Sequence, residues 1–157
     1  MCVEKCYRPN VAAIILSSKY PFKCEFFIAR RKDLKNVWQF PQGGIDTGET
    51  PKEALFRELK EEIGCDHVNI IAEYPHWITY DFPNVVSNKM YPFDGQRQKY
   101  FLVRLKKGAK INLSADKEPE FREWRYVNYE MMLKKITYYK RQNYIKVIEH
   151  FVKEGYI

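Results

Sequence analysis

The segment from Gly43 to Gly64 constrains this chain more than any other, because it joins a glycine-rich turn to a well-marked helix. Thr50 is a capping residue type, Pro51 suits the first helical position, and Glu53 completes a capping box three residues after the cap. Glycine at position 64 is typical of a helix end. The pattern therefore predicts a helix that begins after Thr50 and stops at Gly64.

One stripe of this predicted helix is acidic. At about 100° per residue, Glu58, Glu61 and Glu62 share that stripe. Each like-charged neighbour pair costs roughly 0.2–0.5 kcal/mol on an exposed helix, so the stripe needs a compensating partner. Mg²⁺ and Mn²⁺ prefer oxygen ligands and often bridge carboxylates to phosphates. Spacing alone fits either a metal site or a solvated acidic face. The adjacent apolar face consists of Leu55, Phe56, Leu59 and Ile63.

The residues ahead of the helix favour the metal site, because the glycines of the 43–49 segment let the backbone turn sharply and approach a ligand. Gly43, Glu49 and the run from Arg57 to Gly64 together resemble the signature of the Nudix hydrolases. The match spans more than twenty positions, which makes it far more specific than a short motif. Its one departure is Cys65, where the family usually has a bulky aliphatic residue.

This resemblance implies hydrolysis of a diphosphate linkage in an α+β fold, a Nudix-type α/β/α sandwich with a mixed β-sheet. In the family, the carboxylates matching Glu58, Glu61 and Glu62 hold Mg²⁺ or Mn²⁺, helped by the carbonyl matching Gly43. Glu49 and Arg57 pair to orient the loop against the helix in that family. Either Glu62 or a glutamate outside the motif takes a proton from the attacking water.

The rest of the chain fits one domain over residues 1–157, with a core of about residues 7–151. A helical stripe precedes Gly155 over residues 144–152, and the segment from Asp81 to Gln98 has the composition of a functional loop. Apolar runs predict strands at Val11–Leu16, Phe26–Ala29, Val68–Tyr74, Tyr100–Leu105 and Trp124–Val127.

Four further segments resemble those of the bacterial RNA pyrophosphohydrolases, so the resemblance runs from about residue 7 to residue 151. The segments are Tyr7–Val11, Trp38–Gly44, Pro119–Phe121 and Tyr139–Arg141. The resemblance makes Glu120 a fourth metal ligand or the base, although Pro-Glu-Phe is also an ordinary turn before a strand.

The same resemblance identifies the residues expected to bind RNA. Arg8, Arg31 and Lys140 match phosphate contacts, and Tyr139 beside Arg31 matches a pair that sandwiches a base. Stacking of this kind grips single-stranded RNA with little sequence preference. Taken singly, each of these positions also fits a solvated surface charge or a core tyrosine. The resemblance also assigns Gln39 and Tyr80 to binding of RNA or phosphate.

Charge supports an extended anionic substrate. The chain has 27 Lys and Arg against 20 Asp and Glu, a net charge of +7. Residues 44–73 contain eight acids and three bases, whereas residues 133–148 contain five bases and no acid. A basic rim around an acidic, metal-binding centre would steer phosphates inward. An ordinary basic helix face without a ligand also fits this spacing.

The chain lacks an apolar run of about 20 residues and its N-terminus lacks a signal-peptide pattern, so we expect a cytoplasmic protein without a membrane partner. The spacing of the four cysteines does not favour a zinc site. Reduced thiols are expected, at least two of them buried.

Three functional hypotheses follow. The leading hypothesis is a metal-dependent RNA 5′-pyrophosphohydrolase, which converts the 5′-triphosphate or diphosphate of RNA to a monophosphate, releases pyrophosphate from the triphosphate and favours mRNA decay. The alternative enzyme is a hydrolase of dinucleoside polyphosphates such as diadenosine polyphosphates. The non-enzymatic alternative is an RNA-binding protein on a Nudix fold, which the repulsive stripe of Glu58, Glu61 and Glu62 disfavours.

Overall fold

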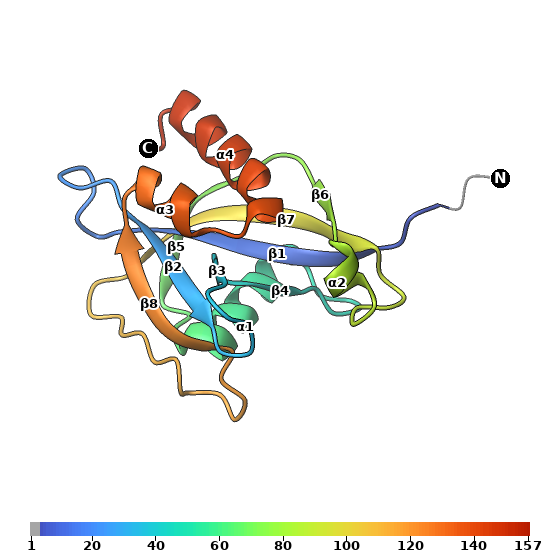
Figure 1. Ribbon diagram of the computed structural model, residues 1–157. Helices are drawn as coiled ribbons and strands as arrows, with labels where there is room; N and C mark the ends of the chain where they lie inside the picture. Colours follow the sequence, from blue (N-terminus) through green and yellow to red (C-terminus); the bar gives the residue numbers. More distant parts are fainter. Residues whose placement is uncertain (1–3) are drawn as a thin grey trace.

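A computed structural model describes residues 4–157 as a mixed eight-stranded sheet with helices on both faces (Figure 1). The helices are α1 (Pro51–Ile63), α2 (Asn84–Ser87), α3 (Tyr129–Lys135) and α4 (Tyr138–Lys153). The strands are β1 (Tyr7–Leu16), β2 (Phe26–Arg31), β3 (Trp38–Gln39), β4 (Gln42–Gly44), β5 (Val68–Glu73), β6 (Ile78–Asp81), β7 (Gly95–Leu105) and β8 (Phe121–Val127). None of the described helices is long and apolar enough to cross a bilayer.

The long strands β1 and β7 form the parallel centre of the sheet, in register from Tyr7 opposite Gly95 to Leu16 opposite Arg104. The remaining pairs, including β1 with β2 and β7 with β5, are antiparallel. Alternate residues of β1 enter two separate cores, since Ala12 and Ile14 pack with residues of α4 while Ala13 and Ile15 pack with residues of α1. Figure 1 shows α1 on one side of the sheet and α3 and α4 on the other. The predicted mixed α/β/α sandwich is confirmed.

Helix α1 begins and ends as its sequence predicts. The Thr50 hydroxyl accepts a hydrogen bond from the Glu53 N–H (3.1 Å), and the Glu53 carboxylate accepts one from the Thr50 N–H (3.3 Å). Gly64 caps the helix in the left-handed region (φ 65°), and a Cβ at this position would lie 2.3 Å from the carbonyl oxygen of Asn112. Only glycine satisfies both conditions at this position.

The segment from Asp81 to Gln98 was expected to be a loop, and this prediction is wrong at both ends. Strand β6 extends to Asp81, α2 lies within the segment, and β7 already begins at Gly95. Residues 95–98 pair with β1 on one side and with β6 on the other. Hydrogen bonding to two neighbours therefore outweighs their polar composition. The strands predicted from apolar runs are present as β1, β2, β5, β7 and β8, and β1, β7 and β8 start earlier than expected.

Three of the four cysteines lie in the described residues. Cys6, Cys24 and Cys65 are free thiols, and of these three only Cys65 is buried. At least two buried thiols were expected; the fourth cysteine, Cys2, lies outside the described residues, so this expectation stays a prediction.

Candidate active site

The three glutamates of the α1 stripe differ in exposure. Glu62 is 3% exposed, the Glu58 side chain is 14% exposed, and the Glu61 side chain is 48% exposed. Glu62 Oε2 accepts a hydrogen bond from the Gln42 N–H of β4 (3.0 Å). The stripe therefore descends from solvent into the protein, beneath the glycine-rich strand.

Arg57 ties the glycine loop to α1. Its Nε and Nη2 donate to the two carboxylate oxygens of Glu49 (2.7 and 2.8 Å), and Nη2 also donates to the Gly44 carbonyl (2.8 Å). The Arg57 guanidinium lowers the pKa of Glu49 to about 2. Its Nη1 donates to Glu58 Oε1 (2.8 Å). The expected pairing of Glu49 with Arg57 is therefore present and orients one oxygen of Glu58.

Two glycines of β4 allow charged side chains to lie against the backbone. A Cβ on Gly43 would fall 1.9 Å from Glu58 Cδ, and a Cβ on Gly44 would fall 2.4 Å from Arg8 Nη2. Both distances are far below van der Waals contact. Any other residue at either position would displace the carboxylate or the guanidinium.

These side chains line a pocket of about 300 Å³. Glu120 enters it from the segment before β8, and Arg8 enters from β1. Eight of the residues proposed for the site are in its lining, namely Arg8, Arg31, Gln39, Gly43, Glu58, Glu61, Glu62 and Glu120. The structure thus gathers four carboxylates and two arginines from segments up to 112 positions apart in the sequence.

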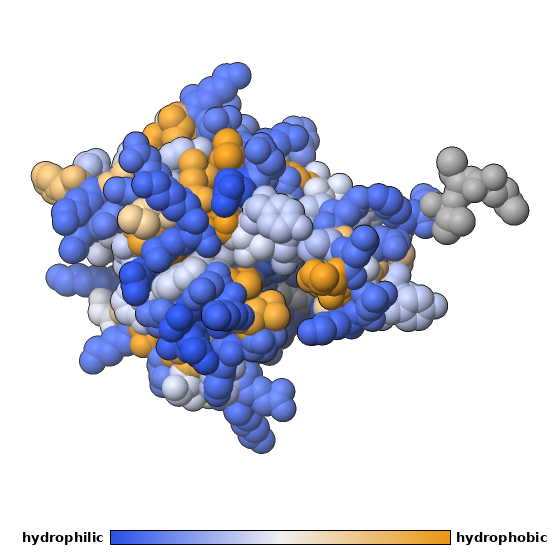
Figure 2. All heavy atoms as spheres, in the orientation of Figure 1, coloured by the Kyte–Doolittle hydropathy of each residue, from blue (hydrophilic) through white to orange (hydrophobic). Residues whose placement is uncertain are grey.

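The other three candidate residues line an adjoining cavity of about 320 Å³, which contains Tyr80, Tyr139 and Lys140. Arg31 lines both cavities and connects them. The ring centroids of Tyr80 and Tyr139 are 5.7 Å apart. Leu34 from one loop and Val86 from α2 line the same cavity, and Figure 2 shows the surface hollowed beside α2. The candidate site therefore has a carboxylate-rich compartment and an aromatic one.

Lys140 is 4% exposed, and its Nζ donates to Gln39 Oε1 (2.8 Å). Burial, with a smaller contribution from the charge of Arg31, lowers the pKa of Lys140 to about 7. The Arg31 guanidinium forms two hydrogen bonds with Asp33 (2.8 and 2.7 Å). Asp33 thus holds the plane of Arg31 between the two compartments.

The electrostatics of the carboxylate-rich compartment fit a bound cation. Burial raises the pKa of Glu58 to about 7 and raises that of Glu62 well above its usual range, and the charge of Glu120 raises both further. Within residues 4–157, Glu62 forms no ion pair. A buried carboxylate without a cationic partner is costly, and a divalent cation removes that cost.

The described residues nevertheless hold no compact group of three or more His, Cys, Asp or Glu side chains arranged to hold a metal ion. Glu58 and Glu61 both turn toward Arg57, whose Nη1 lies 2.8 and 3.3 Å from their carboxylate oxygens. A shared arginine therefore competes with any cation for these two side chains.

A family model described as NUDIX domain matches residues 7–150. This chain belongs to the NUDIX family. An RNA pyrophosphohydrolase of Sulfurovum sp. is 64% identical to it, and one of Campylobacter jejuni is 61% identical, each match covering 98% of both chains. The crystal structure of a C. elegans Ap4A hydrolase binary complex is similar with a TM-score of 0.71 at 20% identity, covering 94% of this chain and 98% of the other.

The carboxylate-rich compartment also contains residues that sequence reasoning missed as site residues, among them Gln96 and Asn10, and Gln98 supports them from behind the lining. Gln96 Oε1 accepts hydrogen bonds from Tyr80 Oη (2.7 Å) and Gln42 Nε2 (3.2 Å), and Gln98 Nε2 donates to Asn10 Oδ1 (2.9 Å). A signal existed in β7. Gln96 and Gln98 continue the inward-facing row that includes Tyr100, so amides at these positions replace expected core residues. Met90 also lines the pocket.

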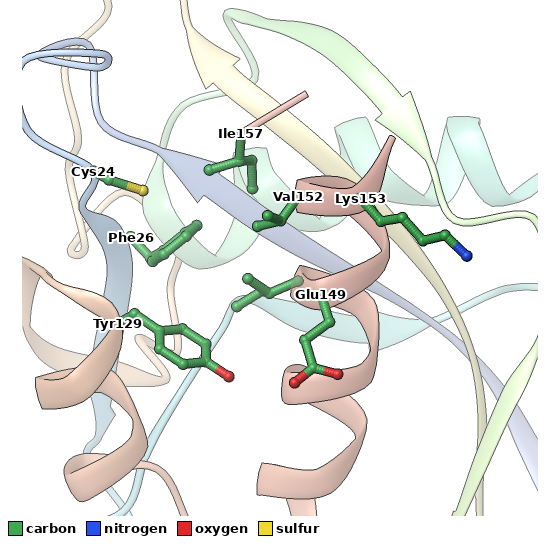
Figure 3. Close-up of a pocket in the computed structure, with 8 residues that line it drawn as sticks. Cys24, Phe26, Tyr129, Glu149, Val152, Lys153 and Ile157 are labelled. Carbon is green, nitrogen blue, oxygen red and sulfur yellow. The ribbon is translucent and has the colours of Figure 1, made fainter. Parts of the chain in front are cut away.

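A third hollow of this NUDIX domain has different chemistry. It encloses about 340 Å³ between β2, α3, α4 and the C-terminus, and its lining includes Phe26, Ile148 and Ile157 (Figure 3). Its charged residues are Glu149 and Lys153, and the Lys153 side chain extends away from the others. The carboxylates that could hold a cation therefore lie in the carboxylate-rich compartment.

Proposed function

We propose that this NUDIX chain is an RNA 5′-pyrophosphohydrolase, which hydrolyses the 5′-triphosphate of RNA to a 5′-monophosphate. The observation that carries the proposal is the single pocket in which Glu58, Glu62 and Glu120 face Arg8 and Arg31. Full-length relatives at 61–64% identity bear the name RNA pyrophosphohydrolase. An acidic centre flanked by arginines suits a reaction in which phosphate charge must be both bound and neutralised.

In this proposal Glu58, Glu61, Glu62 and Glu120, with the Gly43 carbonyl, hold a divalent cation, Mg²⁺ or Mn²⁺. When bound, such a cation neutralises charge on the phosphate oxygens. Either Glu62 or Glu120 accepts the proton of the attacking water, because both lie in the pocket and neither is tied to an arginine.

Substrate binding is assigned to the residues that line the two compartments. Arg8 and Arg31 bind phosphate oxygens, and the buried Lys140, held by Gln39, supplies a further hydrogen-bond donor beside them. Tyr139 and the Arg31 guanidinium plane, with Tyr80 behind them, receive a base in the adjoining cavity. We expect the enzyme to act in the cytoplasm, where such RNA ends arise.

The test is a product assay. A 5′-triphosphorylated RNA incubated with the protein and Mg²⁺ should yield a 5′-monophosphate end and pyrophosphate. An inactive Glu62→Gln protein provides the matched control for contaminating phosphatases. Absence of product under conditions in which the protein cleaves a free nucleotide would contradict the proposal.

The same assay separates the alternative enzyme from the proposed one. Diadenosine tetraphosphate and the RNA are compared at matched concentration, by kcat/KM. A higher kcat/KM for the dinucleotide would identify a dinucleoside polyphosphate hydrolase. Tight RNA binding without any turnover would identify a non-catalytic RNA-binding protein.

A further inference from the structure

A fourth hollow, of about 360 Å³, opens at the C-terminal end of β2 and is lined mainly by basic residues. Its charged lining consists of five cations and one acid, namely Arg30, Arg31, Lys32, Lys35, Arg122 and Asp33. Lys32, Lys35 and Arg122 are exposed and form no ion pair within residues 4–157. This concentration of unneutralised positive charge attracts anions.

The basic hollow adjoins the candidate active site at Arg31. Arg31 lines the basic hollow, the carboxylate-rich compartment and the aromatic compartment. A neighbouring hollow of about 450 Å³ also includes Arg31, and its lining mixes two cations with three acids, namely Arg31, Lys32, Asp33, Glu118 and Glu120, beside Pro119. An extended ligand can therefore pass from the reacting phosphates, along Arg31, to the cations beyond it.

The backbone holds this surface in place. The Arg31 N–H donates to the Val37 carbonyl (2.8 Å), which closes the loop between β2 and β3. The Lys32 N–H donates to the Glu120 carbonyl (2.8 Å), which ties that loop to the segment before β8. In Figure 1 the end of β2 and the start of β8 lie together. Backbone hydrogen bonds therefore fix the loop that carries Lys32 and Lys35 next to Glu120, a proposed catalytic carboxylate.

More cations continue the surface over Trp38. The guanidinium of Arg125 lies 5.3 Å from the centroid of the Trp38 ring, the ammonium of Lys135 lies 5.0 Å from it, and the guanidinium of Arg30 lies 5.9 Å from it. Glu123 pairs with Arg30 (2.8 Å) and neutralises part of this charge.

We propose that this surface, defined by Lys32, Lys35 and Arg122, binds the phosphodiester backbone of the RNA downstream of the 5′ end being hydrolysed. A free nucleotide or a dinucleoside polyphosphate has no phosphodiester chain to lay across these cations. The proposal rests on the proposed function and deepens it, since it makes the polynucleotide chain a part of the recognised substrate. Contacts to phosphates alone do not distinguish one RNA sequence from another.

The test compares two 5′-triphosphorylated RNAs with the same first nucleotides, a dinucleotide and a chain of about twelve nucleotides. We expect the wild type to have a lower KM for the longer RNA, with stronger dependence on salt. The triple variant Lys32→Gln, Lys35→Gln, Arg122→Gln should raise that KM by about 10-fold at low salt and reduce the slope of log KM against log salt by about 2, because each single-strand phosphate contact contributes about 0.7. Its kcat and its KM for the dinucleotide should change less than about 2-fold.

A control variant removes the same charge elsewhere. Lys106, Lys107 and Lys110 are exposed and follow the C-terminal end of β7, roughly 30 Å from Gln96 at the strand rise of about 3.3 Å per residue. Their replacement by Gln should leave both substrates unaffected. Arg122→Gln and the charge-conserving Arg122→Lys provide a single-site pair, in which only the first should raise the KM for the longer RNA.

The outcomes separate the two proposals. If the wild type cleaves neither RNA, the proposed function itself fails. If it cleaves both RNAs with the same KM, or if the triple variant leaves the longer RNA unaffected, the downstream surface is overturned and the proposed function stands. An equal loss in the Lys106, Lys107 and Lys110 variant would also overturn it, since the effect would then reflect net charge alone.

Discussion

Glu49 and Glu62 belong to one continuous sequence motif, but they have different partners and opposite pKa shifts in the structure. Glu49 receives two hydrogen bonds from Arg57, and its pKa falls to about 2. Glu62 is buried with one backbone N–H as its partner, and its pKa rises well above the usual range. The comparison teaches that the partner and the burial of each carboxylate, rather than its place in the motif, separate the structural acids from the candidate catalytic ones.

The largest effect should come from the buried acid. Glu62→Gln retains the shape and the acceptor for the Gln42 N–H, and it removes the charge that would hold a cation or accept a proton. We expect kcat to fall by about 10²–10⁴-fold, the range for loss of a general base. Thermal unfolding followed by circular dichroism should show no loss of stability, because glutamine keeps the hydrogen bond from the Gln42 N–H and brings no charge into this buried position. A kcat near that of wild type would contradict the division drawn between the two acids.

Divalent cations should stabilise the folded protein through the same acids. A ligand that binds only the native state adds about 2.7 kcal/mol at a concentration of 100 times its dissociation constant. We therefore expect Mg²⁺ or Mn²⁺ to raise the melting temperature, measured against NaCl of equal ionic strength. The shift should shrink in Glu62→Gln. An equal shift in the two proteins would place the cation elsewhere.

Arg57 is the partner of Glu49, the paired acid, and Arg57→Ala should mainly lower the stability of the protein. It removes the hydrogen bonds to Glu49 and to the Gly44 carbonyl, and leaves a largely buried carboxylate without its partner. We expect the free energy of unfolding in urea to fall by about 1–3 kcal/mol. Glu49→Gln is the matched control and should cost less, because it keeps the shape and one acceptor. Unchanged stability in Arg57→Ala would mean that this pair does not hold the loop.

The smallest effect should come from the helix cap. Thr50→Ala removes the acceptor for the Glu53 N–H, which typically costs about 1 kcal/mol. Thr50→Ser should retain most of that stability, and kcat should change little in either protein. A large loss of kcat in Thr50→Ala would show that the position of the acidic stripe depends on the cap as well as on Arg57.

Prediction from sequence succeeded where the determinants are local. The capping box at Thr50, the glycine stop at position 64 and the apolar spacing of the last helix involve residues within a few positions of one another. It failed for the segment from Asp81 to Gln98, because Gly95–Gln98 become a strand only through pairing with β1 and β6. Gln96 was missed for the same reason, since its neighbours Gln42 and Tyr80 come from other strands.

The residues of the candidate site also divide into those that local sequence patterns indicated and those that only the fold brings together. The glutamate spacing of α1 and the glycines before it indicated the family, and the family model that matches residues 7–150 bears this out. Eight of the proposed residues share one pocket, while Tyr80, Tyr139 and Lys140 lie in the next, connected by Arg31. The roles of these residues stay predictions until the variants are measured.

By itself the sequence determined the helix, its acidic stripe and the membership of the family, because caps, periodicity and motif spacing are written into neighbouring residues. Only the tertiary structure decided which acids pair with a basic side chain and which are buried without such a partner. It also decided that Arg31 joins a carboxylate-rich, an aromatic and a basic hollow. The physical reason is that burial and electrostatic partnership depend on segments far apart in the chain, such as β4, α1 and the residues before β8, meeting at one edge of the sheet.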